Sequence, residues 1–215
     1  MAQAVIAARG GRGAKSRCSG TLDGADRAAL TAVMLEDMLA ALDRCPAISQ
    51  AWVVTPTPEL AELAVRRGAL LIRQSRPAGL NAAFALAIAE ISETAPYDTL
   101  ALLPGDLPLL EPDDLAAAVM LARTHAVTLA PALDGGTGLL ALRAGAVLPP
   151  AFGAGSFQRH ASDAARRGLS VAVVVAGSLS RDVDQPSDLF EVLEKGPTSL
   201  TATFLRERLK PRIRS

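Results

Sequence analysis

The sequence predicts a single α/β domain in which a mostly parallel, Rossmann-like sheet carries helices on both faces. Short apolar runs alternate with segments of helical periodicity along all 215 residues, an order typical of parallel sheets with crossover helices. Half of the residues are hydrophobic but only 3% are aromatic, which favours aliphatic helices packed on a sheet over an aromatic-rich β-sandwich. No repeat or long linker divides the chain, so we expect one domain over residues 1–215.

The first hundred residues alternate between expected strands and expected helices. Residues 4–8 form an apolar run before a glycine-rich loop, which predicts a buried first strand. Apolar side chains recur every four residues over 30–42, the pattern of an amphipathic helix of about five turns packed on a sheet. Residues 51–55 are the next expected strand. A helix then opens at Pro58 and ends at Gly68, and a third strand is expected at 69–72.

The middle of the chain continues this alternation. Residues 80–91 are apolar on nearly all sides, so we expect their helix to be among the most buried. The continuous apolar run 100–103 is typical of a strand covered on both faces. Pro112 starts a helix that we expect to end near Thr124, followed by a strand at 126–130. A turn at 134–137 then leads into the apolar segment 138–142.

The last third of the chain predicts three more helices and one more strand. We expect Ser156 to cap a helix over 157–167 that ends at Gly168. A strand at 171–175 and a helix at 187–193 follow. Pro197 marks a final amphipathic helix to about Leu209, so the C-terminal helix spans about 197–209. The basic residues at its far end are interpreted as a solvated helix end.

Charge and cysteine content limit the classes of partner and compartment. The 22 Lys and Arg residues balance 22 Asp and Glu residues, which argues against a general nucleic-acid binder. Cys18 and Cys45 match no metal spacing and are expected to be free thiols in a reducing compartment. No apolar stretch reaches the roughly 18–20 residues of a membrane span. We therefore expect a cytoplasmic protein that binds neither nucleic acid nor membrane.

A glycine-rich loop follows the first expected strand, in the order Gly10-Gly11-Arg12-Gly13-Ala14-Lys15-Ser16. Its backbone N–H groups and interleaved cations are suited to a triphosphate. The loop is not a P-loop, because Ala14 replaces the glycine before Lys-Ser. It is not a Rossmann fingerprint either, because Ser16 occupies the third glycine position. A solvent-exposed basic loop stays open as the alternative interpretation.

Three aspartates lie in two turns far apart in the sequence. Asp106 directly follows an apolar run, and Asp182 and Asp184 follow another. In α/β proteins, ligands bind outside the carboxyl ends of the strands, and carboxylates suit a hard divalent cation that also holds phosphate oxygens. Asp182 and Asp184 alternate across Val183, so an extended backbone places both carboxylates on one side. The alternatives are an ordinary turn aspartate at 106 and a helix cap at 184.

A second group of small and hydroxyl residues indicates an anion site. The turn 134–137 has the sequence Asp-Gly-Gly-Thr, and 153–156 has the sequence Gly-Ala-Gly-Ser before an expected helix. Free N–H groups and the helix dipole bind anions at such a position, although ordinary capping by Ser156 explains the pattern equally well. His160 lies four residues later, and we interpret it as a helix-surface or partner-contact residue.

The order of these motifs resembles the guanylyltransferases of deazaflavin coenzyme (F-420) biosynthesis, which act on 2-phospho-L-lactate, phosphoenolpyruvate or 3-phospho-D-glycerate. The resemblance covers nearly the whole chain. It rests on Ala14-Lys15-Ser16-Arg17, Met34-Leu35-Glu36-Asp37, Gly79-Leu80-Asn81, Pro104-Gly105-Asp106-Leu107-Pro108, Asp134-Gly135-Gly136-Thr137, Gly155-Ser156-Phe157 and Asp182-Val183-Asp184-Gln185-Pro186. Two departures are Ala7-Ala8-Arg9, where the family often has Pro-Val-Lys, and Cys18, where an aliphatic residue is usual.

The resemblance implies a nucleotide-diphospho-sugar-transferase-like fold and a magnesium-dependent reaction. It implies that Asp106, Asp182 and Asp184 bind the metal and are catalytic together with Lys15. It implies that Thr137, Gly153 and Ser156 bind the phosphorylated acid. GTP is expected to contact Arg9, Gly11, Gly13, Lys15, Arg17, Gly79 and Asn81.

We therefore expect an enzyme that transfers GMP from GTP to the phosphate of a small phosphorylated carboxylic acid and releases pyrophosphate. A downstream transferase and a second copy of the chain are possible protein partners. Two alternatives stay open: a molybdopterin guanylyltransferase-like enzyme of the same fold, and a non-catalytic nucleotide-binding module. The sequence does not identify the acceptor acid.

Overall fold

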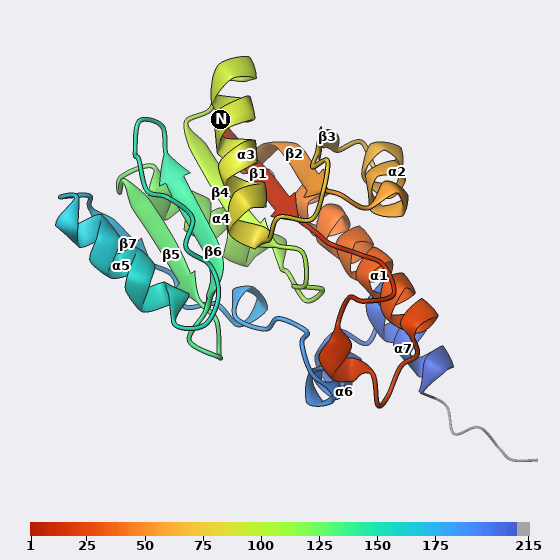
Figure 1. The fold of residues 1–215 in the computed structure, drawn as a ribbon. Helices are drawn as coiled ribbons and strands as arrows, with labels where there is room; N and C mark the ends of the chain where they lie inside the picture. Colours follow the sequence, from red (N-terminus) through yellow and green to blue (C-terminus); the bar gives the residue numbers. More distant parts are fainter. Residues whose placement is uncertain (210–215) are drawn as a thin grey trace, which may run out of the picture.

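A seven-stranded sheet runs through the molecule (Figure 1), and the computed structural model describes residues 1–209 around it. The strand order is β3-β2-β1-β4-β6-β5-β7. Only β6 runs antiparallel to its neighbours, β4 and β5; the other pairs are parallel. The predicted fold class, a mostly parallel sheet with helices on both faces, is confirmed.

The described elements follow the predicted alternation closely. The strands are β1 Ala2–Ala7, β2 Ile48–Thr55, β3 Leu70–Arg73, β4 Thr99–Pro104, β5 Val127–Pro131, β6 Thr137–Arg143 and β7 Val171–Val173. The helices are α1 Gly24–Asp43, α2 Pro58–Arg66, α3 Leu80–Thr94, α4 Pro112–Ala122, α5 Ser156–Arg166, α6 Pro186–Lys195 and α7 Leu200–Arg208, with short 3-10 turns η1 Ser16–Cys18 and η2 Gly177–Leu179.

Two apolar clusters cover the two faces of the sheet. One packs side chains of α1, α2 and α4 against it, including Met38, Leu60 and Leu115. The other packs α3 and α5 against the opposite face, with Phe84 and Ala164 fully buried. Aliphatic residues supply most of both clusters, as the composition predicts.

A third apolar cluster lies beyond the sheet, where α1 meets α6 and α7 (Figure 1). It buries Cys18 and Leu22 from the loop after β1, and it buries Val183 from the segment before α6. Burial of such side chains stabilises the fold by roughly 1.5–3 kcal/mol each. This cluster therefore anchors two loops that are remote in sequence beside each other.

Three predicted elements differ from the structure. Helix α3 buries only Ala83, Phe84, Ala87 and Ile91, and Leu86 is 37% exposed. The expectation of a deeply buried helix was wrong because α3 covers one face of the sheet and its alanines are tolerated in solvent. Strand β7 ends at Val173, and Val175 is 86% exposed.

The C-terminal helix begins later than predicted. Pro197 lies in the preceding turn, and α7 starts at Leu200 because the Ser199 side chain accepts a hydrogen bond from the Ala202 N–H. The basic stretch beyond Leu209 lies outside the described residues. Within 1–209, none of the helices combines the length and apolarity that crossing a bilayer would require.

Candidate functional site

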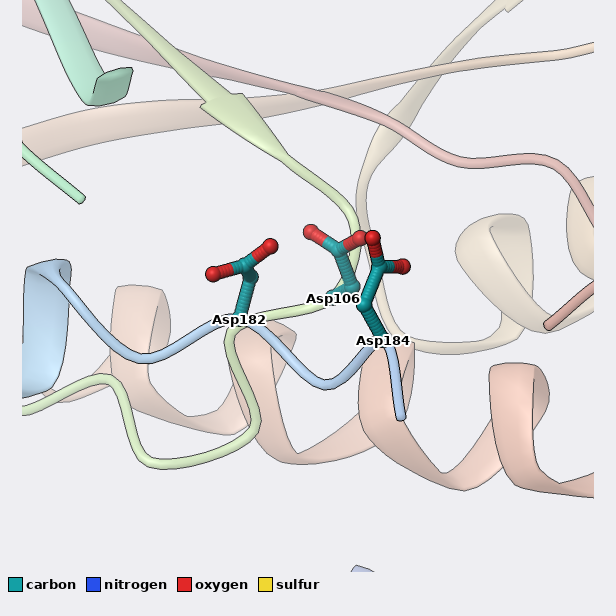
Figure 2. Close-up of side chains that lie close together, drawn as sticks. All are labelled: Asp106, Asp182 and Asp184. Carbon is teal, nitrogen blue, oxygen red and sulfur yellow. The ribbon is translucent and has the colours of Figure 1, made fainter. Parts of the chain in front are cut away.

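The three aspartates that the sequence singled out meet at one point (Figure 2). Asp106 follows the end of β4, and Asp182 and Asp184 lie on the segment before α6. One carboxylate oxygen from each lies within 4.8 Å of the others. The Val183 N–H donates a 3.0 Å hydrogen bond to the Asp106 carbonyl, which ties the two segments together. The prediction that these residues converge is confirmed.

Local packing explains how the carboxylates are presented. Val183 is 1% exposed and enters the third apolar cluster, so its two neighbours in the extended chain turn the opposite way, toward the site. Gly105 lies against the first strand, where an added Cβ would approach Ala8 Cβ to 2.7 Å. The turn that carries Asp106 therefore requires glycine.

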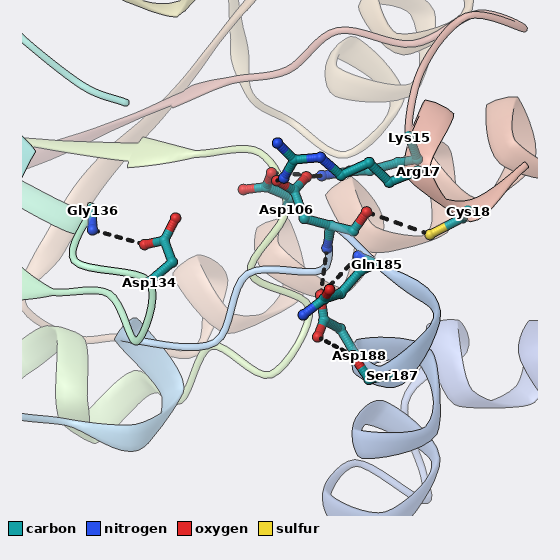
Figure 3. A network of polar contacts seen from close by, with 10 residues as sticks. Lys15, Arg17, Cys18, Asp106, Asp134, Gly136, Gln185, Ser187 and Asp188 are labelled. Atoms are coloured by element: carbon teal, nitrogen blue, oxygen red, sulfur yellow. Dashed lines mark hydrogen bonds and ion pairs between the residues drawn. The ribbon is translucent and has the colours of Figure 1, made fainter. Parts of the chain in front are cut away.

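Asp188 holds Asp184 in place, and the sequence analysis gave it no role. Its Oδ2 accepts hydrogen bonds of 2.8 Å from the backbone N–H groups of Asp184 and Gln185 (Figure 3). Gln185 and Asp188 form a capping box at the start of α6. The alternative that Asp184 itself caps this helix is therefore wrong. The Gln-x-x-Asp spacing, with Pro186 at the first helical position, could have indicated the box.

Two cations from the loop after β1 reach the carboxylates (Figure 3). Lys15 Nζ lies 2.6 Å from Asp106 Oδ2 and 3.0 Å from Asp184 Oδ1. Arg17 Nη1 lies 3.3 Å from Asp184 Oδ2. Burial works to lower the pKa of Lys15, but Asp106 and Asp184 outweigh it, and the pKa is raised. Lys15 therefore stays a cation in this site.

Asp182 has the least compensated charge of the three. Burial, followed by repulsion from Asp106, Asp134 and Asp184, raises its pKa to about 6. Asp106 Oδ1 is buried and has no hydrogen-bond donor within the described structure. Like charges held this close favour either protonation or a bound cation. The donor set of three hard carboxylate oxygens fits a divalent cation.

A cavity of about 460 Å³ adjoins the carboxylates. Its wall combines the loop after β1, the start of α3 and the Asp106 turn. Of the residues predicted to contact GTP, it is lined by Arg9, Gly13, Lys15, Arg17 and Gly79. Gly11 and Asn81 do not line it. Asn81 instead bonds the backbone of Phe152, with Oδ1 at 2.7 Å from its N–H nitrogen and Nδ2 at 3.1 Å from its carbonyl oxygen.

Arg27 shapes the loop from behind, a role that sequence reasoning missed. Its guanidinium donates to the carbonyl oxygens of Ala14 at 3.0 Å, Leu22 at 2.8 Å and Arg12 at 2.8 Å. Lys15 has φ 49° and ψ 45°, the one positive φ at a non-glycine residue in 1–209. An L-residue adopts this conformation at an energetic cost. The guanidinium and the Cys18 and Leu22 anchors together hold the loop in the shape that aims Lys15 at the aspartates.

Thr137 and Ser156 come together, but both side chains are buried. Thr137 is 5% exposed, Ser156 is fully buried, and the Ser156 hydroxyl donates to Thr137 Oγ1 at 2.9 Å. Ser156 is the first helical residue and Gly155 is the cap, so the predicted cap at Ser156 was wrong. The N–H groups of Ser156 and Phe157 bond the Gly153 and Gly135 carbonyls, so these two are not free as expected.

His160 is fully buried, so its interpretation as a surface residue was wrong. Its Nδ1 lies 3.0 Å from Thr137 Oγ1, and its Nε2 accepts from the Ala151 N–H at 2.9 Å. Burial, with a smaller contribution from Arg159, lowers the pKa of His160 to about 4. The ring is therefore neutral at physiological pH.

Comparisons with known proteins identify related chains. The family model described as "Guanylyl transferase CofC like" matches residues 2–212. The chain is 51% identical to a 3-phospho-D-glycerate guanylyltransferase from Phenylobacterium zucineum, over 100% of both chains. It is 35% identical to a phosphoenolpyruvate guanylyltransferase from Sphaerobacter thermophilus, covering 88% of this chain and 91% of that one.

The fold also has solved relatives. A crystal structure from Desulfovibrio desulfuricans, provisionally described as a nucleotide-diphospho-sugar transferase, superposes with a TM-score of 0.79. The two chains are 20% identical, and the match covers 96% of this chain and 94% of the other. At this identity the likeness establishes the fold, which is the one that the sequence resemblance implied.

Proposed function

This chain belongs to the CofC-like guanylyl transferase family, and we propose that it transfers GMP from GTP to the phosphate of a small phosphorylated carboxylic acid in coenzyme F-420 biosynthesis. A phosphate oxygen of the acid attacks the α-phosphorus of GTP. The bond to the bridging oxygen breaks, and pyrophosphate leaves with the electron pair. Because the attacking oxygen is already anionic, the step needs no strong general base.

The observation that carries this proposal is the convergence of Asp106, Asp182 and Asp184 within 4.8 Å, beside a cavity of about 460 Å³ that Asp106 and Asp184 line. These carboxylates would hold Mg²⁺. When bound, the metal supplies charge neutralisation at the reacting phosphates. The acidic set, the orphaned Asp106 Oδ1 and the raised pKa of Asp182 all support a cation at this place.

In this proposal, side chains of the loop after β1 bind the triphosphate of GTP. Lys15 and Arg17 already lie beside the carboxylates, and Arg9 lines the same cavity. Positioning and fixed positive charge of this kind lower the barrier for phosphoryl-type transfer. Gly79 lines the same cavity. Thr137, Gly153 and Ser156 are proposed to receive the acid.

Among the acids, we place 3-phospho-D-glycerate first. The relative of that name is 51% identical over the whole chain, whereas the phosphoenolpyruvate enzyme is 35% identical. We further propose that the diphosphate-linked product passes to a transferase and, from the two free thiols Cys18 and Cys45, that the enzyme works in the cytoplasm. Self-association stays a prediction that gel filtration with light scattering would test.

A pyrophosphate-release assay tests the reaction. Each of the four common nucleoside triphosphates is combined with each of the three acids, with Mg²⁺ and with chelator. We expect release with GTP, an acid and Mg²⁺ together, fastest with 3-phospho-D-glycerate. Tight GTP binding without release under any condition would instead identify a non-catalytic nucleotide-binding module. A further set of reactions replaces the acids with molybdopterin, and release only in that set would identify a molybdopterin-type enzyme.

A further inference from the structure

His160 has a fixed protonation pattern, set by two neighbours. The Ala151 N–H always carries a proton, so His160 Nε2, 2.9 Å away, must accept. A neutral ring then has its proton on Nδ1. Nδ1 lies 3.0 Å from Thr137 Oγ1, and the ring is held edge-on against Phe152 at a centroid distance of 5.2 Å. The Nδ1–H group is therefore a donor aimed at the Thr137 hydroxyl.

The Nδ1–H donor leaves the Thr137–Ser156 pair with one hydroxyl proton that is not used in a hydrogen bond. His160, Thr137 and Ser156 bring three protons to two hydrogen bonds, of 3.0 and 2.9 Å. His160 uses one proton in the first bond, and the Ser156 hydroxyl uses a second proton in the other. The third proton stays on Thr137, whose hydroxyl has no further acceptor among the described contacts. The other tautomer of His160 would accept from Thr137 and consume that proton.

The hydroxyl pair lies beside the segment that leads into Asp182. Gly138, next to Thr137, packs so closely on this segment that an added Cβ would lie 1.6 Å from the Leu179 carbonyl oxygen. The Leu133 N–H donates to the Ser180 carbonyl at 3.0 Å. Asp134, at the turn before β6, is close enough to raise the pKa of Asp182. Figure 3 shows Asp134 and Gly136, which lie just before Thr137 in the chain, on the side of Asp106 away from Lys15.

We propose that His160 is a positioning residue for the acceptor: its Nδ1–H forces the Thr137–Ser156 pair to present a hydroxyl proton to an anionic oxygen of the phosphorylated acid. This inference rests on the proposed function and deepens it. His160 itself does not touch the acid. It acts through Thr137, so its loss weakens binding of the acid and leaves binding of GTP intact.

Two substitutions separate the two hydrogen bonds of the ring. His160→Asn can keep an N–H near the Nδ1 position and lose the acceptor for Ala151. His160→Gln can keep an acceptor near Nε2 and lose the donor to Thr137. We expect His160→Gln to raise the KM for the acid about tenfold, the effect of one lost hydrogen bond. We expect His160→Asn to stay within about threefold.

The KM for GTP and the melting temperature complete the test. We expect the KM for GTP to change less than about twofold in both variants. The matched control is His125→Gln in the turn after α4, the one other histidine of the sequence, which should leave both KM values unchanged. Equal changes in both KM values, or a change in melting temperature alone, would reduce His160 to a structural role and overturn the inference.

NMR of the unmodified protein tests the tautomer without any variant and without turnover. In ¹⁵N-histidine-labelled protein, we expect the His160 ring to be protonated on Nδ1 and to stay neutral from pH 8 to pH 5.5. A ring protonated on Nε2 would contradict the inference even if the wild-type enzyme is fully active. An enzyme that releases no pyrophosphate with any acid would instead overturn the proposed function, whatever the tautomer.

Discussion

Replacing Asp182 by asparagine should stabilise the metal-free protein at neutral pH while abolishing its activity. The folded-state pKa of this carboxyl is raised from 3.8 to about 6. The folded protein therefore holds the proton more tightly than the unfolded chain, and stability falls as pH rises through roughly 4–6. Above that window the full penalty of the ionised group is present. Asparagine has the same shape and carries no charge, so it removes the penalty.

The expected size follows from the shift. A change of about two pKa units corresponds to about 3 kcal/mol, and solvent screening of this half-buried side chain reduces it to about 1–2 kcal/mol. For a chain of this length, that raises the melting temperature by about 2–6 °C.

Thermal unfolding in chelator, at pH 7.5 and pH 4, measures the effect. We expect Asp182→Asn to be more stable than wild type at pH 7.5 and equal to it at pH 4. With Mg²⁺ at pH 7.5 the order should reverse, because the wild type binds the metal and gains stability from it. Glu93→Gln removes an exposed carboxyl on α3 and should change stability by less than about 0.5 kcal/mol. If Asp182→Asn is less stable than wild type in chelator at pH 7.5, or is still more stable than wild type at pH 4, the ionised Asp182 does not destabilise the metal-free protein and the reasoning is wrong.

Three further substitutions test how the site is held. Gly105→Ala puts a Cβ 2.7 Å from Ala8 Cβ and should lower kcat at least about tenfold by displacing the Asp106 turn; kinetics near wild type would show that the turn adapts. Arg27→Met releases three loop carbonyls and should raise the KM for GTP several-fold while the KM for the acid stays constant, measured with each substrate saturating in turn. Asp188→Asn weakens two hydrogen bonds at the start of α6 and should lower the free energy of unfolding by about 1–2 kcal/mol. It should also weaken Mn²⁺ binding, which calorimetry measures. Unchanged Mn²⁺ binding would show that the cap does not position the metal ligands.

The aspartate cluster could be predicted from the sequence because two simple patterns apply to its segments. A continuous apolar run identifies a central parallel strand, and its carboxyl end is where ligands bind. Alternation across Val183 places Asp182 and Asp184 on one side, and the structure shows the buried side chain that enforces it. Both inferences depend on local pattern and on the common polarity of parallel strands, which the chain itself specifies.

The roles of His160 and Arg27 depend on contacts that no local pattern encodes. His160 reaches Thr137, 23 residues earlier on another element, and its spacing from Ser156 is the same on a buried and on an exposed helix face. Arg27 lies in the first turn of α1 and contacts carbonyls up to 15 residues earlier, which depend on the path of an irregular loop. The predicted deep burial of α3 was wrong for a related reason, because alanine is common on both buried and exposed helix faces.

The distribution of charge around the cluster divides it into two sides. Lys15 contacts Asp106 and Asp184, and Arg17 also contacts Asp184, whereas no ion pair to Asp182 is present within residues 1–209. Lys15 and Arg17 thus lie on the side of the cavity proposed for the triphosphate. Asp182 lies on the other side, where Asp134 adds further negative charge. The guanidinium of Arg159 also lies on that side, but it already donates to the carbonyl oxygens of Ala151 and Ala154. A phosphorylated acid that approaches the Thr137 hydroxyl is an anion that comes close to the carboxylates of Asp182 and Asp134. Its binding should therefore depend on the divalent cation more steeply than the binding of GTP does, and titrating each substrate over a range of Mg²⁺ concentrations would measure the difference.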